Sequence, residues 1–136
     1  MGGRESTRRL DFEALRRAIE RGDHASMIGF YAAAARVRVL DGGTVSFEVE
    51  GRAEVAKYLR AVHARPATHR VQNEVLAVDR ILFEESCEYP DGARTVIETR
   101  LEVRGGKISR QVDVVIGREG PTRGGVRESQ EGRSGM

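Results

Sequence analysis

Residues 69–117 constrain the fold of this chain more than any other part of its sequence. Four segments in this stretch are rich in Val, Ile and Leu and alternate between apolar and polar residues: 69–80, 81–90, 93–104 and 107–117. Such alternation is typical of strands in a sheet with two different faces. Compact turns separate the later segments, at Pro90-Asp91-Gly92 and at Gly105-Gly106. The sequence therefore predicts three or four long antiparallel strands here.

Two helices are predicted before these strands. Phe12, Leu15 and Ile19 are spaced as on one buried helix face within residues 10–21, and Gly22 predicts the end of that helix. Asp23 is a good N-cap for a second, short helix. We expect this second helix to bury three side chains: Met27, Ile28 and Tyr31.

A short hairpin and a third helix are predicted next. Residues 32–40 end in alternating Arg and Val and predict a strand that stops at Asp41-Gly42-Gly43, and residues 44–49 predict a weaker strand that pairs with it. The third helix begins after Gly51 and ends before Pro66. Its apolar positions recur at the spacing of one buried stripe: Val55, Tyr58, Leu59 and Val62.

This order of elements predicts the α+β class, with the helices on one side of a mainly antiparallel sheet. We expect residues 10–117 to form one domain. Residues 1–9 are predicted to be a flexible N-terminal segment. Residues 118–136 are mostly Gly, Ser, Arg and Glu and hold too little apolar surface to offset the entropy of ordering them, so we expect a disordered tail.

The composition indicates a soluble, cytoplasmic protein. Hydrophobic residues make up 39% and charged residues 32% of the 136 residues, and no apolar run approaches the length of a membrane span. The N-terminus lacks the apolar segment of a signal peptide. Cys87 is the single cysteine, which excludes an internal disulfide and fits a reducing compartment.

The charge distribution argues against a nucleic-acid partner. The chain carries a formal net charge of +2, of which residues 1–9 contribute +2 and residues 118–136 contribute +1, which leaves −1 for residues 10–117. Binding to phosphate needs clustered Lys and Arg, and binding to single strands also needs exposed aromatics. The chain has only three Tyr, four Phe and no Trp, and its charges alternate in sign, so we expect no nucleic-acid partner. The lack of an apolar span likewise predicts no membrane partner.

Polar residues of the last two predicted strands are the first candidates for chemistry. A two-residue glycine turn would pair Glu98 with Asp113 and Arg100 with Gln111. Two carboxylates beside an arginine can act as an acid and a base, because repulsion and burial separate their pKa values. The alternative is a solvated outer face of ion pairs, and a three-residue turn would shift all of these pairs.

His69 and Asn73 begin the first long strand, and regular alternation puts both on the face of Val71 and Val75. Polar side chains on an otherwise apolar strand face need partners. One possibility is that the two residues line a pocket, where they hydrogen-bond and polarise a substrate. The other is that they have a structural role only and find their hydrogen-bond partners within the protein.

A family resemblance covers residues 10–117 and rests on the order of the elements and on three junctions: Gly22-Asp23, Gly51-Arg52 and Gly106-Lys107-Ile108. The chain resembles the nuclear transport factor 2-like superfamily, and most of all its SnoaL-like proteins. The resemblance implies a cone, in which a curved sheet wraps around the three helices and leaves a pocket at the open end. It also implies homodimers through the outer sheet face. Relatives include polyketide cyclases, ketosteroid isomerases, epoxide hydrolases, dehydratases and noncatalytic proteins, so the fold alone does not define the function.

Two arguments disagree on which sheet face lines such a pocket. Hydrophobic burial favours the face of Ile97 and Val112, which is the more apolar. The resemblance favours the other face, because in ketosteroid isomerase-like relatives the residue that matches Glu98 points into the pocket. We expect this second arrangement, since the apolar face would then form the interface of an obligate dimer.

The chain also departs from its relatives. The general base of ketosteroid isomerases falls near Val39 and their helix 1 tyrosine falls at Leu15, and neither residue can perform that chemistry. Asp113 lies near the place where SnoaL-like cyclases carry an acid on the last strand. Tyr31 and Tyr58 are candidates for pocket hydroxyls, although such tyrosines are more often core aromatics.

The sequence therefore predicts a protein that binds a small, largely apolar organic molecule. The predicted catalytic residues are Asp113, Glu98 and His69. The predicted substrate-binding residues are Asn73, Tyr31, Tyr58, Arg100 and Gln111. Scattered histidines and one cysteine offer no metal-ligand spacing, so we expect neither a metal nor a cofactor. A SnoaL-like enzyme would catalyse cyclisation, isomerisation or hydration, and the alternative is a noncatalytic ligand-binding or dimerisation module.

Overall fold

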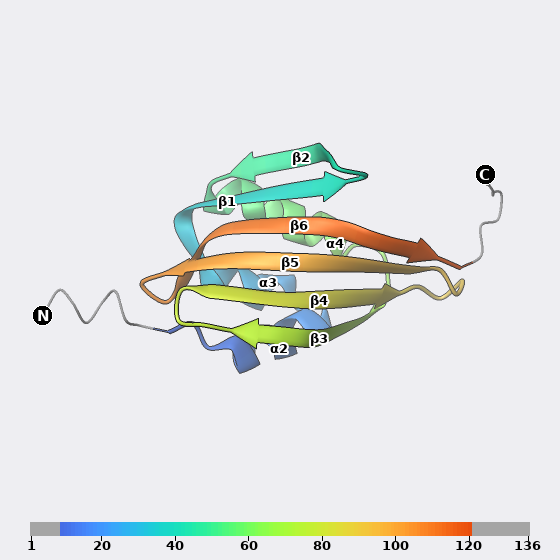
Figure 1. Cartoon of the computed structure of the whole chain (residues 1–136), viewed down its shortest axis with the longest axis horizontal. Helices are drawn as coiled ribbons and strands as arrows, with labels where there is room; N and C mark the ends of the chain where they lie inside the picture. Colours follow the sequence, from blue (N-terminus) through green and yellow to red (C-terminus); the bar gives the residue numbers. More distant parts are fainter. Residues whose placement is uncertain (1–8, 121–136) are drawn as a thin grey trace, which may run out of the picture.

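The computed structural model describes residues 9–120, in which helices cover one face of a six-stranded sheet (Figure 1). The helices are α2 (Phe12–Arg21), α3 (His24–Met27), the 3-10 helix η1 (Ile28–Phe30) and α4 (Arg52–Val62). The strands are β1 (Tyr31–Asp41), β2 (Thr44–Glu50), β3 (Thr68–Leu76), β4 (Arg80–Glu88), β5 (Arg94–Arg104) and β6 (Lys107–Glu119). Residues 1–8 and 121–136, which hold most of the segments predicted to be flexible or disordered, lie outside the described residues.

The sheet is mainly antiparallel, as predicted. Its strand order is β2-β1-β6-β5-β4-β3, and among the described strands only β1 and β6 pair in parallel. The β1–β2 hairpin therefore extends the same sheet as the later strands. β6 runs two residues beyond Gly117, and a salt bridge of 2.6 Å from Arg118 to Asp41 ties its end to the end of β1. The predicted α+β class is confirmed.

Side-chain caps explain where the first helices begin and end. Asp11 accepts a hydrogen bond of 3.1 Å from the backbone N–H of Ala14 at the start of α2. Gly22 ends α2 with a φ of 66°, a left-handed conformation that glycine adopts at little cost. Asp23 then caps α3 through the N–H of Ser26. None of the helices within residues 9–120 is long and apolar enough to cross a membrane.

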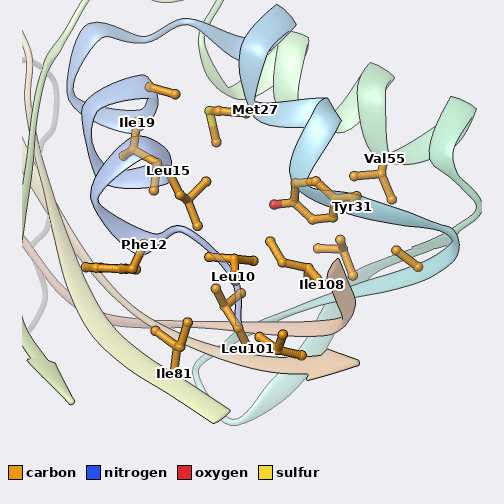
Figure 2. Close-up of a cluster of buried hydrophobic side chains, with 14 of the residues drawn as sticks. Leu10, Phe12, Leu15, Ile19, Met27, Tyr31, Val55, Ile81, Leu101 and Ile108 are labelled. Carbon is orange, nitrogen blue, oxygen red and sulfur yellow. The ribbon is translucent and has the colours of Figure 1, made fainter. Parts of the chain in front are cut away.

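The core lies between the helices and the inner face of the sheet, which is the face turned toward the helices (Figure 2). It joins side chains from α2, α3, α4 and the strands: Leu15, Ile19, Met27, Val55, Ile81, Leu101 and Ile108. Burial of each such side chain contributes about 1.5–3 kcal/mol, so these contacts hold the helices on the sheet. Tyr31 belongs to this core, but it is the first residue of β1 rather than part of the second helix, where we predicted it.

A β-bulge in β6 decides which residues of the last strands face the helices. The register of β5 and β6 shifts between Glu102 and Val103, where Ser109 is an extra residue on β6. A shift of one residue moves the following side chains to the opposite face of a strand. Beyond the bulge, Asp113 consequently pairs with Thr99, and both side chains are buried on the inner face.

The predicted cross-strand pairs are therefore wrong. Glu98 does not pair with Asp113, and Arg100 does not pair with Gln111. Glu98 and Arg100 lie instead on the outer face, where they form a salt bridge of 2.9 Å with each other. Neither of the two predicted arrangements of the sheet holds, because the bulge makes β5 turn its apolar face inward while β6 turns its polar one inward.

A second bulge changes the edge strand β3. Asn73 has a φ of 57°, and the register of β3 and β4 shifts between Gln72 and Val75. The left-handed residue interrupts the alternation, so Asn73 is exposed and donates a hydrogen bond of 2.9 Å to Glu84. The prediction that Asn73 shares the inner face with His69 is wrong for this reason, whereas His69 itself is buried.

Candidate functional site

Asp113, the acid predicted on the last strand, lies in a buried hydrogen-bond network. One carboxylate oxygen accepts a bond of 2.9 Å from the Thr99 hydroxyl, and the other accepts a bond of 2.8 Å from the Tyr58 hydroxyl. The side-chain nitrogen of Gln111 lies 3.0 Å from both oxygens. The Tyr31 hydroxyl donates in turn to the side-chain oxygen of Gln111. We call these five side chains the Asp113 network.

Burial makes Asp113 an unusual carboxylic acid. Its side chain leaves water on folding, and this raises the pKa of Asp113 to about 6, although the hydrogen bonds from Tyr58, Gln111 and Thr99 lower it. Burial, reinforced by the charge of Asp113, also raises the pKa of Tyr58 and of Tyr31 far above their ordinary value. Both tyrosines therefore stay protonated at neutral pH, while Asp113 exchanges a proton near pH 6. Such an acid suits proton transfer under physiological conditions.

An open groove lies beside this network, between the β1–β2 hairpin and α4. Its volume is about 540 Å³, and its lining is mostly apolar. The Phe47 ring stacks on Tyr58 with the ring centroids 5.3 Å apart, and both residues line the groove. Val39, a third lining residue, is the cross-strand neighbour of Asp113. Tyr58 therefore lies between the groove and the buried acid.

A second polar cluster lies near the C-terminal end of α4. In this cluster Nδ1 of His69 is 2.8 Å from a carboxylate oxygen of Glu85, and the sulfur of Cys87 is 3.5 Å from the same nitrogen. His63 follows α4 directly, and its ring centroid is 4.7 Å from that of His69. Burial lowers the pKa of His63 and raises the pKa of the Cys87 thiol, which favours the uncharged form of both.

The interior between the Asp113 network and the second cluster is almost filled. A cavity of about 20 Å³ lies there, and its polar lining comes from Tyr31, Glu85, Thr99 and Gln111. Such a space holds about one water molecule, whereas pockets for small organic ligands measure roughly 300–1,000 Å³. The groove beside Tyr58 has the volume that an organic ligand needs, and the small cavity does not.

The structure brings together four of the eight residues that we predicted for the site. These four meet in the Asp113 network: Asp113, Gln111, Tyr31 and Tyr58. His69 lies in the second cluster, beside Glu85. The other three predicted residues lie on the outer face, away from both groups: Glu98, Arg100 and Asn73.

Four residues of these two groups were not predicted as site residues: Thr99, Glu85, His63 and Cys87. The sequence did contain a signal for Glu85, because this acid alternates with buried neighbours along β4: Ile81, Phe83 and Cys87. His63 follows Leu59 by four residues, the spacing of the buried stripe of α4. Thr99 carries no comparable signal, since its contact with Asp113 depends on the bulge at Ser109.

The second cluster also contains a candidate set of metal ligands. His63, His69 and Glu85 each offer a ligand atom, and these atoms lie within 4.8 Å of one another. The prediction that no metal binds rested on ligand spacing along the sequence, which says nothing about residues that the fold brings together. The Asp113 network, in contrast, offers one carboxylate and neutral donors, which suits proton transfer better than metal binding.

No protein-family model and no curated protein matches the sequence, but solved structures share its fold. An NTF2-like protein of unknown function from Mesorhizobium loti superposes with a TM-score of 0.70 at 16% identity, over 78% of this chain and 88% of that one. A provisionally assigned ketosteroid isomerase from Kribbella flavida has a TM-score of 0.64 at 20% identity, over 90% and 89%. A provisionally assigned polyketide cyclase from Xanthomonas campestris has a TM-score of 0.59 at 22% identity, over 76% and 85%.

Proposed function

This chain has the nuclear transport factor 2-like fold, and on that premise we propose that it binds a small, largely apolar organic molecule in the groove between the β1–β2 hairpin and α4. The observation that carries the proposal is the position of Tyr58, whose ring lines the groove and whose hydroxyl donates to Asp113. An apolar lining with one polar group is the usual composition of a small-molecule site, because the apolar surface supplies affinity and the polar group fixes orientation.

The chemistry that we propose is proton transfer without a cofactor, of the kind expected for a SnoaL-like enzyme. An ionised Asp113 accepts the Tyr58 proton while the Tyr58 oxygen takes a proton from the bound substrate. Return of the proton to a different substrate atom then completes an isomerisation or cyclisation and restores both residues. Thr99 and Gln111 hold the carboxylate in place throughout. The assignments of two similar structures as a ketosteroid isomerase and a polyketide cyclase support this reaction class.

A noncatalytic ligand-binding module is the second candidate. The hydrogen bonding of Asp113 favours this candidate. Both of its carboxylate oxygens already accept hydrogen bonds, and the donors are Thr99, Tyr58 and Gln111. In this case the acid serves to fix α4 to the sheet, and the groove binds its ligand without turnover.

A ligand screen tests the binding proposal. Small apolar carbonyl compounds are screened by ligand-observed NMR against the full chain, and each hit is mapped by the shifts of assigned amide and methyl signals. We expect hits to shift the signals of Val39, Phe47 and Tyr58, which line the groove. Shifts confined to the outer face around Arg100, or no hits at all, would count against the groove.

Variants then separate the two candidates. For any hit that the protein converts, Asp113→Asn and Tyr58→Phe should each remove turnover and leave the groove able to bind. Glu98→Gln is the matched control, because it neutralises an acid of the neighbouring strand that lies on the outer face. Full turnover by Asp113→Asn would exclude the proposed acid. Binding without conversion between about pH 5 and 8 would favour the noncatalytic module.

We also propose that the chain forms a homodimer through the outer sheet face. A depression of about 490 Å³ on this face is surrounded by apolar and charged side chains, among them Val75, Leu82, Val112 and Arg100. The apolar side chain of Val75 is 61% exposed, and a partner copy would cover it. Sedimentation velocity should show a dimer that Val112→Asp dissociates, and a monomer at all concentrations up to about 100 μM would rule this out.

A further inference from the structure

We propose that His63, His69 and Glu85 form a binding site for a divalent transition-metal ion of the zinc type. Two imidazoles and one carboxylate are a ligand set that zinc binds tetrahedrally, with a water molecule in the fourth position. The three residues come from three different elements: the end of α4, strand β3 and strand β4. A bound ion would therefore join α4 to the edge of the sheet.

The three ligand atoms would have to move closer together when an ion binds. The three ligand atoms lie within 4.8 Å of one another, whereas the ligand atoms of one tetrahedral zinc ion lie about 3.3 Å apart. The His69 nitrogen and the Glu85 oxygen are already 2.8 Å apart. His63 is the residue that has to approach; it directly follows the last residue of α4, and its side chain is half-buried.

An unpartnered nitrogen of His63 is the second observation. Nε2 of His63 is the one buried side-chain nitrogen or oxygen within residues 9–120 that has no hydrogen-bond partner. Its Nδ1 lies 2.9 Å from the carbonyl oxygen of Leu59 and must carry the hydrogen that this bond needs, so the lone pair lies on Nε2. A buried polar atom without a partner is costly, and a metal ion would satisfy it.

The surroundings of His63 resemble the support that histidine ligands of metals receive in proteins. A histidine ligand usually donates its other ring N–H to a backbone carbonyl or a carboxylate, which orients the ring. Leu59 provides such a carbonyl for His63. Gly22 lies beside the rings of His63 and His69, since a Cβ atom at this position would be at van der Waals distance from them, 3.6 Å from Cδ2 of His63 and 4.0 Å from Cδ2 of His69.

This site shares no residue with the groove lining or with the Asp113 network. Its three residues do not line the groove, and none of them donates a hydrogen bond to Asp113. The metal would accordingly tie the C-terminal end of α4 to β3 and β4, and the proposal does not depend on the reaction proposed above.

Metal titration of the untagged full chain, first stripped with a chelator, tests the site. We expect one equivalent of Co²⁺ to produce the visible absorption of a tetrahedral complex, Zn²⁺ to displace it, and Zn²⁺ to raise the melting temperature. His63→Ala and Glu85→Gln should each weaken binding by at least about 100-fold. His24→Ala is the matched control, because its ring lies beside His63, with centroids 6.3 Å apart, outside the ligand set.

The control should bind Co²⁺ as the unchanged chain does. Absence of saturable binding to the unchanged chain would overturn the proposal, and so would unchanged affinity in His63→Ala and Glu85→Gln. Amide NMR spectra show whether each variant keeps its fold. If His63→Ala unfolds, the metal affinity of Glu85→Gln alone tests the proposal, because this variant keeps the size of the side chain and removes only its charge.

Discussion

The hydroxyl of Tyr58 donates a hydrogen bond of 2.8 Å to Asp113, and this bond connects an open groove with a buried acid. The two residues are 55 positions apart in the sequence and belong to α4 and β6. A bond between such distant elements forms only when the helix has packed on the sheet. We therefore expect changes at Tyr58 to be detectable at Asp113, and changes at Asp113 to affect the stability of the whole domain.

Tyr58→Phe should raise the pKa of Asp113 above its value of about 6. Burial holds this pKa high, and the Tyr58 hydrogen bond is the strongest of the influences that lower it. A ¹³C NMR titration of the Asp113 carboxyl carbon measures the change. The same variant should lose about 1–3 kcal/mol of stability above pH 6, where the bond is made to a charged group.

Tyr89→Phe is the control for this variant. It also removes a tyrosine hydroxyl, but Tyr89 contributes no hydrogen bond to Asp113 and is only partly buried. A pKa of Asp113 that stays the same or falls in Tyr58→Phe would contradict the geometry.

Asp113→Asn should change the pH dependence of stability. The folded-state pKa of Asp113 is raised from its ordinary 3.8 to about 6, so the folded chain binds the proton more tightly than the unfolded chain. The resulting stabilisation is fully present below pH 3.8 and is lost as the pH rises to about 6. Asparagine does not ionise, so the variant does not lose this stability as the pH rises. Its stability relative to the unchanged chain should therefore rise by about 3 kcal/mol between pH 3.5 and pH 7.

Urea denaturation at several pH values measures this difference. The other carboxylates titrate in both proteins and cancel when the two curves are subtracted. A difference that does not vary with pH would show that Asp113 has an ordinary pKa in the folded chain, and it would weaken the case for acid–base chemistry.

Phe47→Ala should weaken the binding of a ligand in the groove. Phe47 is 41% exposed and stacks on Tyr58, so its removal opens one wall without disturbing the core. Loss of an aromatic contact corresponds to roughly 3–10-fold weaker binding of an NMR screening hit. Val45→Ala is the control, since Val45 is a similarly exposed residue of β2 that does not line the groove. Equal effects of the two variants would place the ligand elsewhere.

Asn73→Ala should destabilise the chain by about 1–2 kcal/mol more than Asn73→Gly. Both variants lose the hydrogen bond to Glu84, but only glycine adopts the left-handed φ of 57° without strain. Thermal or urea denaturation of the two variants isolates this conformational cost. Equal stability would mean that β3 can lose its bulge, with Val75 then turning to the inner face.

The bulges at Ser109 and at Asn73 mark the limit of what the alternation of polarity can predict. The pattern along residues 93–104 and 107–117 correctly predicted two strands and a tight turn between them, which the structure forms over Arg94–Arg104 and Lys107–Glu119. It could not predict the extra residue Ser109, because a serine on a strand carries no sign that the register shifts there. The pairing of Glu98 with Asp113 failed for this one reason, and Thr99 became the partner of the acid instead.

The sequence by itself determined the elements and their class, because helix caps, helical spacing and strand alternation are local patterns that neighbouring residues enforce. It also identified Asp113, Gln111, Tyr31 and Tyr58 as individual candidates. Only the tertiary structure decided that these four meet around one carboxylate, that Glu98 and Asn73 face outward, and that His63 reaches His69 and Glu85. The physical reason is that register and burial arise from packing between distant segments, where one inserted residue exchanges the two faces of a strand.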